Sequence, residues 1–203
     1  MTNTARPVHN PSMPNLLPDI VSADLFTKLA QPTLTAEDGL TLRPWVHGDA
    51  PAVRIAYQDP EIQAWHCRSI DTEEEAHQFI DRWRTGWREA AAAQWAVVDG
   101  EQVVGRVGFR YMAPAEGEAE VAYWTMPGHR GQRIAPRALT TLIAWAFDDI
   151  GFHRLALVHS VRNSASCRVA QATGFTLEGT QRSACAHTDG WHDMHLHALI
   201  NPR

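Results

Sequence analysis

Cysteine and long apolar runs are scarce in this sequence. Its three cysteines, Cys67, Cys167 and Cys185, are odd in number and lack the spacing of a metal-ligand set, so free thiols in a reducing compartment are expected rather than a disulfide framework. No apolar run approaches the roughly 18 residues of a membrane span, and the N-terminus lacks a basic-then-apolar signal pattern. We therefore expect a cytoplasmic protein with no membrane partner.

Positive charge is also in short supply. The chain carries 18 Lys and Arg against 23 Asp and Glu, a formal net charge of −5, which argues against a nucleic-acid partner and weakly favours a cationic acceptor. With 44% apolar and 20% charged residues in 203 positions, the composition is that of a globular protein long enough to bury a substantial core.

The stretch 118–146 predicts a strand, a turn and a helix. Aromatic and β-branched residues alternate up to Met126, which suits a buried strand, and Pro127-Gly128 ends it. Apolar residues at three- and four-residue steps then predict a helix that packs on a sheet. Residues 130–135 would leave free backbone N–H groups at the start of this helix, where the helix dipole favours a phosphate. Many α/β proteins share such a unit, so its neighbours decide what it does.

Patterns on either side complete one domain. Four prolines within residues 1–18 predict a mobile or loosely docked tail, and residues 19–30 have the spacing of a short helix or a strap. We expect an N-terminal extension over 1–37 and the main domain over 38–203. The main domain should begin with a strand over 40–46, a helix capped by Asp49, a connector over 62–70 and a helix opened by the Thr72–Glu75 capping box. Two strands joined at Asp99-Gly100 should precede the central unit. After it we expect a strand over 154–160, a helix over 163–173, and strands over 175–184 and 191–200.

Two segments resemble motifs of a known family. R-G-Q-R-I-A, residues 130–135, is similar to the [Q/R]-x-x-G-x-[G/A] acyl-CoA pyrophosphate loop of the GNAT superfamily of N-acetyltransferases. N-S-A-S-C-R-V-A-Q-A-T-G-F-T-L-E-G, residues 163–179, resembles a segment of its RimJ/RimL-like branch. Arg133 departs from the pattern, because the family has a glycine there and glycine tolerates a positive φ that arginine does not easily adopt.

The resemblance implies the GNAT fold, an α/β (α+β) architecture with a central mixed, mostly antiparallel twisted sheet of about seven strands and about four flanking helices. It implies transfer of an acetyl group from acetyl-CoA, or of another short acyl group, to a primary amine by direct attack in a ternary complex. The acceptor would be a protein N-terminus or a small amine, and a homodimer is possible. The alternative is a non-catalytic acyl-CoA-binding or sensing module, which the departure at Arg133 motivates.

The resemblance also assigns roles to individual residues. Backbone groups of the central strand would pair with the pantetheine arm, the loop amides would hold the diphosphate, and Asn163 would lie near the thioester. The expected cofactor-binding residues are Trp124, Thr125, Met126, Arg130, Gly131, Gln132, Arg133, Ile134, Ala135 and Asn163. For Asn163, a purely structural role as a helix N-cap is equally open.

Attack by an amine requires a neutral nitrogen, so a carboxylate on the central strand is a candidate general base. Glu120 is the first choice and Glu118 the second, although both could be ordinary residues at an exposed strand end. Ser166, with Tyr123 behind it, is the candidate that stabilises the leaving thiolate, unless it only decorates the first turn of its helix. For acceptor binding the candidates are Trp65, His66, Glu118 and Trp191.

One pattern is typical of metal binding. In H-D-M-H-L-H, residues 192–197, His195 and His197 share a strand face. Third and fourth ligands are not evident in the sequence and the transfer chemistry needs none, so no metal is expected. Cys167 is expected to be a small buried apolar residue.

Overall fold

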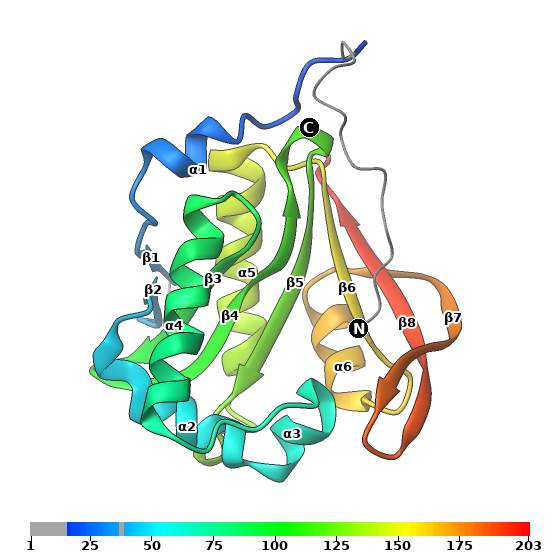
Figure 1. The fold of residues 1–203 in the computed structure, drawn as a ribbon. Helices are drawn as coiled ribbons and strands as arrows, with labels where there is room; N and C mark the ends of the chain where they lie inside the picture. Colours follow the sequence, from blue (N-terminus) through cyan, green and yellow to red (C-terminus); the bar gives the residue numbers. More distant parts are fainter. Residues whose placement is uncertain (1–15, 37–38) are drawn as a thin grey trace.

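The computed structural model describes residues 16–36 and 39–203 (Figure 1). The expected tail over 1–18 therefore lies mostly outside the described residues. Within the described ranges the chain forms six α-helices and one eight-stranded sheet. The elements are α1 (Asp24–Lys28), β1 (Leu34–Thr35), β2 (Thr41–Pro44), α2 (Ala50–Gln58), α3 (Pro60–His66), α4 (Glu73–Arg88), β3 (Ala93–Asp99), β4 (Gln102–Ala113), β5 (Glu118–Thr125), α5 (Ile134–Ala144), β6 (Arg154–Ser160), α6 (Ser164–Ala172), β7 (Thr176–His187) and β8 (Gly190–Ile200).

The sheet separates at its only parallel pair. Its order is β1-β2-β3-β4-β5-β6-β8-β7, and every neighbouring pair is antiparallel except β5 and β6. β5 and β6 pair over three positions, from Glu118–Arg154 to Glu120–Ala156. Beyond these positions the two strands diverge (Figure 1). The mixed, mostly antiparallel sheet predicted from the sequence is confirmed.

Apolar residues cover both faces of the sheet. Along β3, Ala96 and Val98 belong to the core beneath α2 and α4, whereas Trp95 and Val97 belong to the core beneath α5. This alternation follows from the two-residue period of a strand buried on both sides. The sheet, with its diverging strands, therefore lies between α2 and α4 on one face and α5 on the other.

Two local expectations need correction. Asp49 does not cap α2 through its side chain; its carboxylate receives a bidentate ion pair from Arg43, at 2.7 Å for each contact. The connector expected over 62–70 begins as helix α3, because Pro60 suits the first turn and Asp59 accepts the Ile62 N–H at 3.0 Å. Proline and the acidic cap were interpreted only as a helix break.

The segment 19–36 packs against the domain as a strap. Val21 is 4% exposed and Phe26 1% exposed, and the Phe26 ring meets Trp87 edge-on at 5.2 Å. The indole N–H of Trp87 donates to the carbonyl of Leu29, and that of Trp95 to the carbonyl of Pro32. This segment thus contributes side chains to the main core. A domain boundary near residue 37 stays a prediction.

In the described part of the chain, no helix has the length and apolarity needed to cross a bilayer.

Candidate active site

The divergence of β5 and β6 opens a cavity of about 1120 Å³. Residues 121–125 of β5 and 157–160 of β6 line it between the two strands. On the α5 side its wall consists of the residues before and at the start of α5 and of one face of α6; on the α4 side it consists of α3, α4 and the middle of β4. The cavity thus has a half on each face of the sheet.

The loop before α5 has the geometry expected of an anion site. Arg133 is the N-cap of α5 and has φ of 57°, the left-handed conformation for which the family uses glycine. Arginine therefore adopts the required backbone shape, at a cost of roughly 1–2 kcal/mol. The first amides of an α-helix have no partner within the helix, so those of Ile134 and Ala135 point where a phosphate would bind.

Arg130 is engaged elsewhere in this structure. Its guanidinium pairs with Asp59, the cap of α3, and with Glu61 at 2.8 Å. Arg130 lines the cavity, but its charge is shared with two carboxylates rather than directed at the α5 terminus. The loop is thereby connected to α3.

The start of α6 places two polar residues, Asn163 and Ser166, beside Tyr123 of β5. Asn163 is 8% exposed, and its side-chain oxygen accepts the Ser166 N–H at 3.0 Å, so its capping role is real. The Tyr123 hydroxyl donates to the Ser166 carbonyl at 3.5 Å. Burial raises the pKa of Tyr123 to about 12, so its phenol keeps its proton at neutral pH.

Positive charge accumulates in the other half of the cavity. Arg106 of β4 is 6% exposed; it donates to the Tyr57 hydroxyl at 3.3 Å and lies over the Trp83 ring. No carboxylate of the described residues pairs with Arg106, and burial lowers the pKa of its guanidinium. Three further arginines line the same half, Arg68, Arg82 and Arg110.

His66 lies among these cations. Burial, followed by the charge of Arg106, lowers the pKa of His66 to about 3, although the backbone of Tyr123 favours the protonated form. The imidazole is therefore neutral at physiological pH. This is the effect expected when like charges surround a partly desolvated base.

Most predicted site residues meet in this cavity. Lining residues among them are Trp65, His66, Trp124, Thr125, Arg130, Gly131, Arg133, Ile134, Ala135, Asn163 and Ser166. Five do not line it: Glu118, Glu120, Met126, Gln132 and Trp191. Their roles, like those of the lining residues, stay predictions.

The two candidate bases are held in ion pairs. The carboxylate of Glu120 meets the guanidinium of Arg110, which itself lines the cavity. Glu118 lies 3.8 Å from Arg154 at the start of β6. Trp191 is 62% exposed near the start of β8; it does not line the cavity, although it pairs with Ala186 of β7, which does.

Sequence reasoning missed the arginine-rich half. Arg106 is not among the residues predicted for the site, although an arginine inside the apolar run V-V-G-R-V-G-F is a usable signal of a buried charge. The expected preference for a cationic acceptor came from the net charge of the whole chain. The local charge in the cavity is opposite in sign to that net charge.

Comparison with known proteins supports the interpretation of this geometry. A family model described as "Acetyltransferase (GNAT) domain" matches residues 39–176. The chain is 24% identical over 169 residues to the uncharacterized N-acetyltransferase YoaA of Bacillus subtilis, covering 82% of this chain and 96% of that protein. It is 30% identical over 109 residues to the ribosomal-protein-serine acetyltransferase of Escherichia coli, covering 54% of this chain and 61% of that one.

Solved structures share the fold. A RimL ribosomal L7/L12 α-N-protein acetyltransferase in complex with coenzyme A superposes with a TM-score of 0.76 at 21% identity, over 83% of this chain and 98% of that one. The predictions of the GNAT fold, of RimJ/RimL-like relatives and of acetyl-CoA as co-substrate are confirmed. The chain belongs to the GNAT family of acetyltransferases.

Proposed function

We propose that this N-acetyltransferase modifies a primary amine whose molecule also carries an anionic group. The observation that carries the proposal is Arg106, a buried cation facing the cavity with no carboxylate partner among the described residues. A buried charge is costly unless it is paired, so a site that keeps one is suited to receive its partner with the substrate. A carboxylate or phosphate on the acceptor would serve.

The same cations favour the nucleophilic form of the amine. Positive charge lowers the pKa of a nearby base, as it does at His66. An acceptor ammonium held beside Arg106 and Arg110 would lose its proton more readily than in water. We propose that this environment, with water or Glu120 receiving the proton, generates the neutral amine for attack on the thioester.

Groups at the start of α6 and beside it would protonate the leaving thiolate. Tyr123 keeps its proton and reaches the Ser166 carbonyl, so both side chains lie at one edge of the cavity. We assign proton donation to the leaving thiolate to Tyr123 first and to Ser166 second. The sequence analysis ranks Ser166 first and Tyr123 second. General acid catalysis of this kind contributes typically about 10²–10⁴-fold to a rate.

The acceptor class, the compartment and the assembly belong to the proposal. The RimL neighbour acts on ribosomal L7/L12, as its description states, and a protein N-terminus is one acceptor that fits. A small amino acid or phosphorylated amine is the other. A cytoplasmic location, a homodimer and the absence of a nucleic-acid partner remain proposals.

Matched acceptors test the proposal. Acetyl-CoA and the protein would be mixed with pairs of amines that differ only in a carboxylate, such as an amino acid and its amide, while the free thiol of CoA is measured. We expect the carboxylate-bearing member to have kcat/KM higher by about 10-fold or more, the value of one charge-assisted hydrogen bond. Equal rates for all such pairs would overturn the preference for an anion without questioning acetyl transfer.

The non-catalytic module is tested separately. Its motivation, Arg133, adopts the conformation that the loop needs, which weakens the case for it. If acetyl-CoA raises the melting temperature while no amine or peptide releases thiol above hydrolysis, the sensing module is the better description. Turnover that falls in Tyr123→Phe or Ser166→Ala supports the enzyme.

A further inference from the structure

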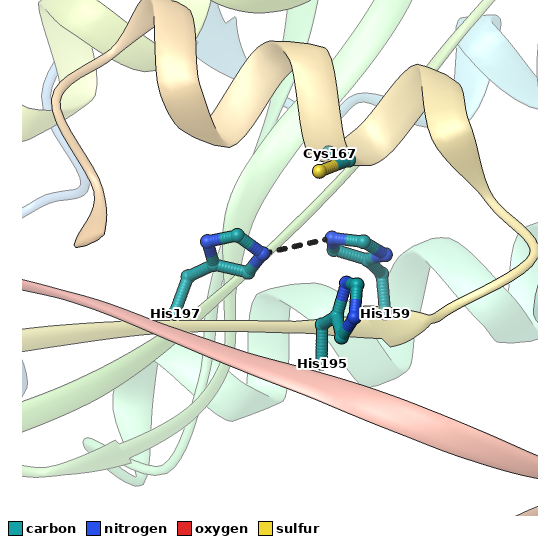
Figure 2. Close-up of side chains that lie close together, drawn as sticks. All are labelled: His159, Cys167, His195 and His197. Atoms are coloured by element: carbon teal, nitrogen blue, oxygen red, sulfur yellow. Dashed lines mark hydrogen bonds between the residues drawn. The ribbon is translucent and has the colours of Figure 1, made fainter. Parts of the chain in front are cut away.

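Four potential metal ligands from three elements meet beneath α6. His159 lies on β6, His195 and His197 lie on β8, and Cys167 lies on α6 (Figure 2). One ligand atom from each lies within 4.8 Å of all the others. The sequence indicates only the two histidines on β8, because the pairing of β8 with β6, which brings His159 beside them, joins strands that are not consecutive in the chain.

Strand pairing explains why the three imidazoles share one face. His159 is directly opposite His195, and Leu157, two residues before His159, is opposite His197. Successive side chains alternate between the faces of a sheet, so these positions all point to the side covered by α6. Figure 2 shows the Cys167 sulfur on the strand-facing side of the helix, above the rings.

Hydrogen bonding leaves a ring nitrogen of His159 available. Its Nδ1 donates to the Ser160 carbonyl at 2.8 Å, because a carbonyl can only accept. In the neutral ring, Nε2 then carries a lone pair and accepts from the Nε2–H of His197 at 3.2 Å. For both Nε2 atoms to bind one ion, His197 must transfer that proton to its own Nδ1. Fixing one tautomer through a backbone carbonyl is the usual outer-shell arrangement of a metal-bound histidine.

Two ring nitrogens of the cluster have no partner. Nδ1 of His195 and Nδ1 of His197 are buried without a hydrogen-bond partner in the described chain. Buried polar atoms are rarely left unpaired, and a bound ion is one explanation for such atoms.

We propose that His159, Cys167, His195 and His197 form a tetrahedral binding site for a transition-metal ion, with Zn²⁺ as the expected occupant. A zinc–nitrogen bond of about 2.0–2.1 Å places two ligand nitrogens roughly 3.3 Å apart, close to the observed contact between His159 and His197. Binding requires the thiol of Cys167 to release its proton to solvent as the sulfur–metal bond forms.

The ligand set selects the class of metal. Three imidazoles and a thiolate are borderline to soft donors, whereas Mg²⁺ and Ca²⁺ require oxygen ligands. Four protein ligands close a tetrahedral site, so the ion would be structural and leave no position for a substrate. It would attach α6 to β6 and β8, and α6 carries Ser166 one residue before the proposed ligand Cys167.

Cobalt provides the direct test, because it reports its own ligands. The reduced full-length protein, freed of metal with a chelator, would be titrated with Co²⁺. We expect saturation at one Co²⁺ per chain, the strong visible absorption of tetrahedral Co²⁺ and a thiolate-to-cobalt charge-transfer band, all removed by Zn²⁺. Zn²⁺ alone should raise the melting temperature.

Matched variants locate the ion. Cys167→Ser should abolish the charge-transfer band and Cys67→Ser and Cys185→Ser should keep it. His195→Gln should weaken Co²⁺ binding at least about tenfold, the lower end of what loss of an outer-shell partner costs; His77→Gln, a similarly half-buried histidine on α4, should leave it unchanged. Far-ultraviolet circular dichroism would confirm that each variant folds.

Three outcomes overturn the proposal. They are no tetrahedral cobalt spectrum in the wild-type protein, a charge-transfer band that survives Cys167→Ser, and a band lost in Cys67→Ser or Cys185→Ser. None of these measurements uses acetyl transfer, so the metal site stands or falls independently of the proposed function.

Discussion

The two halves of the cavity carry positive charge in different ways. Beside α5 the groups are backbone amides, arranged by a helix start and by the left-handed residue Arg133. Beside α4 they are arginine side chains from separate elements, with Arg106 buried among aromatic rings. Backbone amides can be kept whatever the side chains are, whereas side chains can change without altering the backbone. If acetyl-CoA binds at the amides and the acceptor at the arginines, as proposed above, the backbone fold determines cofactor binding and exchangeable side chains determine the choice of acceptor.

The largest expected effect comes from placing a negative charge in the amide half. Ala135→Glu would put a carboxylate at the start of α5, where it repels the phosphates of acetyl-CoA; we expect a rise in KM for acetyl-CoA of about 100-fold, or about 3 kcal/mol. The same carboxylate favours the helix dipole, so the melting temperature should not fall. Ala135→Ser is the control, and an unchanged KM in Ala135→Glu would mean that the phosphates bind elsewhere.

Removing the buried charge of Arg106 should affect the acceptor and not acetyl-CoA, because Arg106 lies in the half of the cavity beside α4. Arg106→Gln is expected to lower kcat/KM for an anionic acceptor by about 30-fold, or about 2 kcal/mol, with little change in KM for acetyl-CoA. Arg84→Gln, an exposed arginine on α4, is the matched control. Steady-state kinetics with both substrates varied would measure the two effects. A loss that is equal for acceptors with and without a carboxylate would contradict the assignment.

Lowering the pH should reduce the stability of the folded protein, because His66 in the arginine-rich half resists protonation. The pKa of His66 is about 3 in the folded protein, against about 6.5 unfolded, so the unfolded chain binds more protons between these values and stability falls as pH drops from 6.5 toward 3. His66 alone accounts for up to about 2 kcal/mol between pH 6.5 and pH 5.

Denaturant unfolding at both pH values measures this loss. His66→Gln should show a smaller loss than the wild-type protein, whereas His153→Gln, an exposed histidine, should behave like it. An identical pH dependence in His66→Gln and the wild type would show that this imidazole is not held neutral.

The smallest effect concerns the backbone of the amide half. Arg133→Gly relieves the left-handed conformation and should raise the free energy of unfolding by up to about 1 kcal/mol, partly offset by the freedom of glycine in the unfolded chain. Thermal unfolding and acetyl-CoA titration would be compared with Gln132→Gly beside it. Affinity that improves more than about tenfold, or about 1.4 kcal/mol, would show that the arginine impairs the loop.

The residues of the amide half could be proposed from the sequence because their signals are local. The loop over 130–135 and the cap at Asn163 each lie within one short stretch, and Asn163 and all of the loop except Gln132 line the cavity. The arginine half and the histidine cluster depend on strand pairing. Arg106 and Tyr57 are 49 positions apart and His159 and His197 are 38 apart, so no local pattern contained either pair.

Strand order and burial also explain the smaller differences. The two-residue strand β1 is too short for a periodic signal and is placed by its pairing with β2. The helix α1 lies within the helical spacing seen over 19–30, but the core contacts of Val21 and Phe26 that dock the segment are not local. Glu120 was chosen for its position on β5, but a neighbouring strand supplies Arg110 as its partner. The position of a residue along a strand predicts the face of the sheet that its side chain occupies, but it does not predict the partner of that side chain.

The strap over 19–36 has a consequence for the order in which the chain folds during synthesis. Its partners are made long after it: Trp87 lies 58 residues beyond Leu29, Trp95 lies 63 beyond Pro32, and Ile20 pairs with Ala115 of the turn before β5. Contacts of such high sequence separation form late because a long loop must close first. On the ribosome, Phe26 is therefore expected to emerge before its core partners, which include Phe152 as well as Trp87.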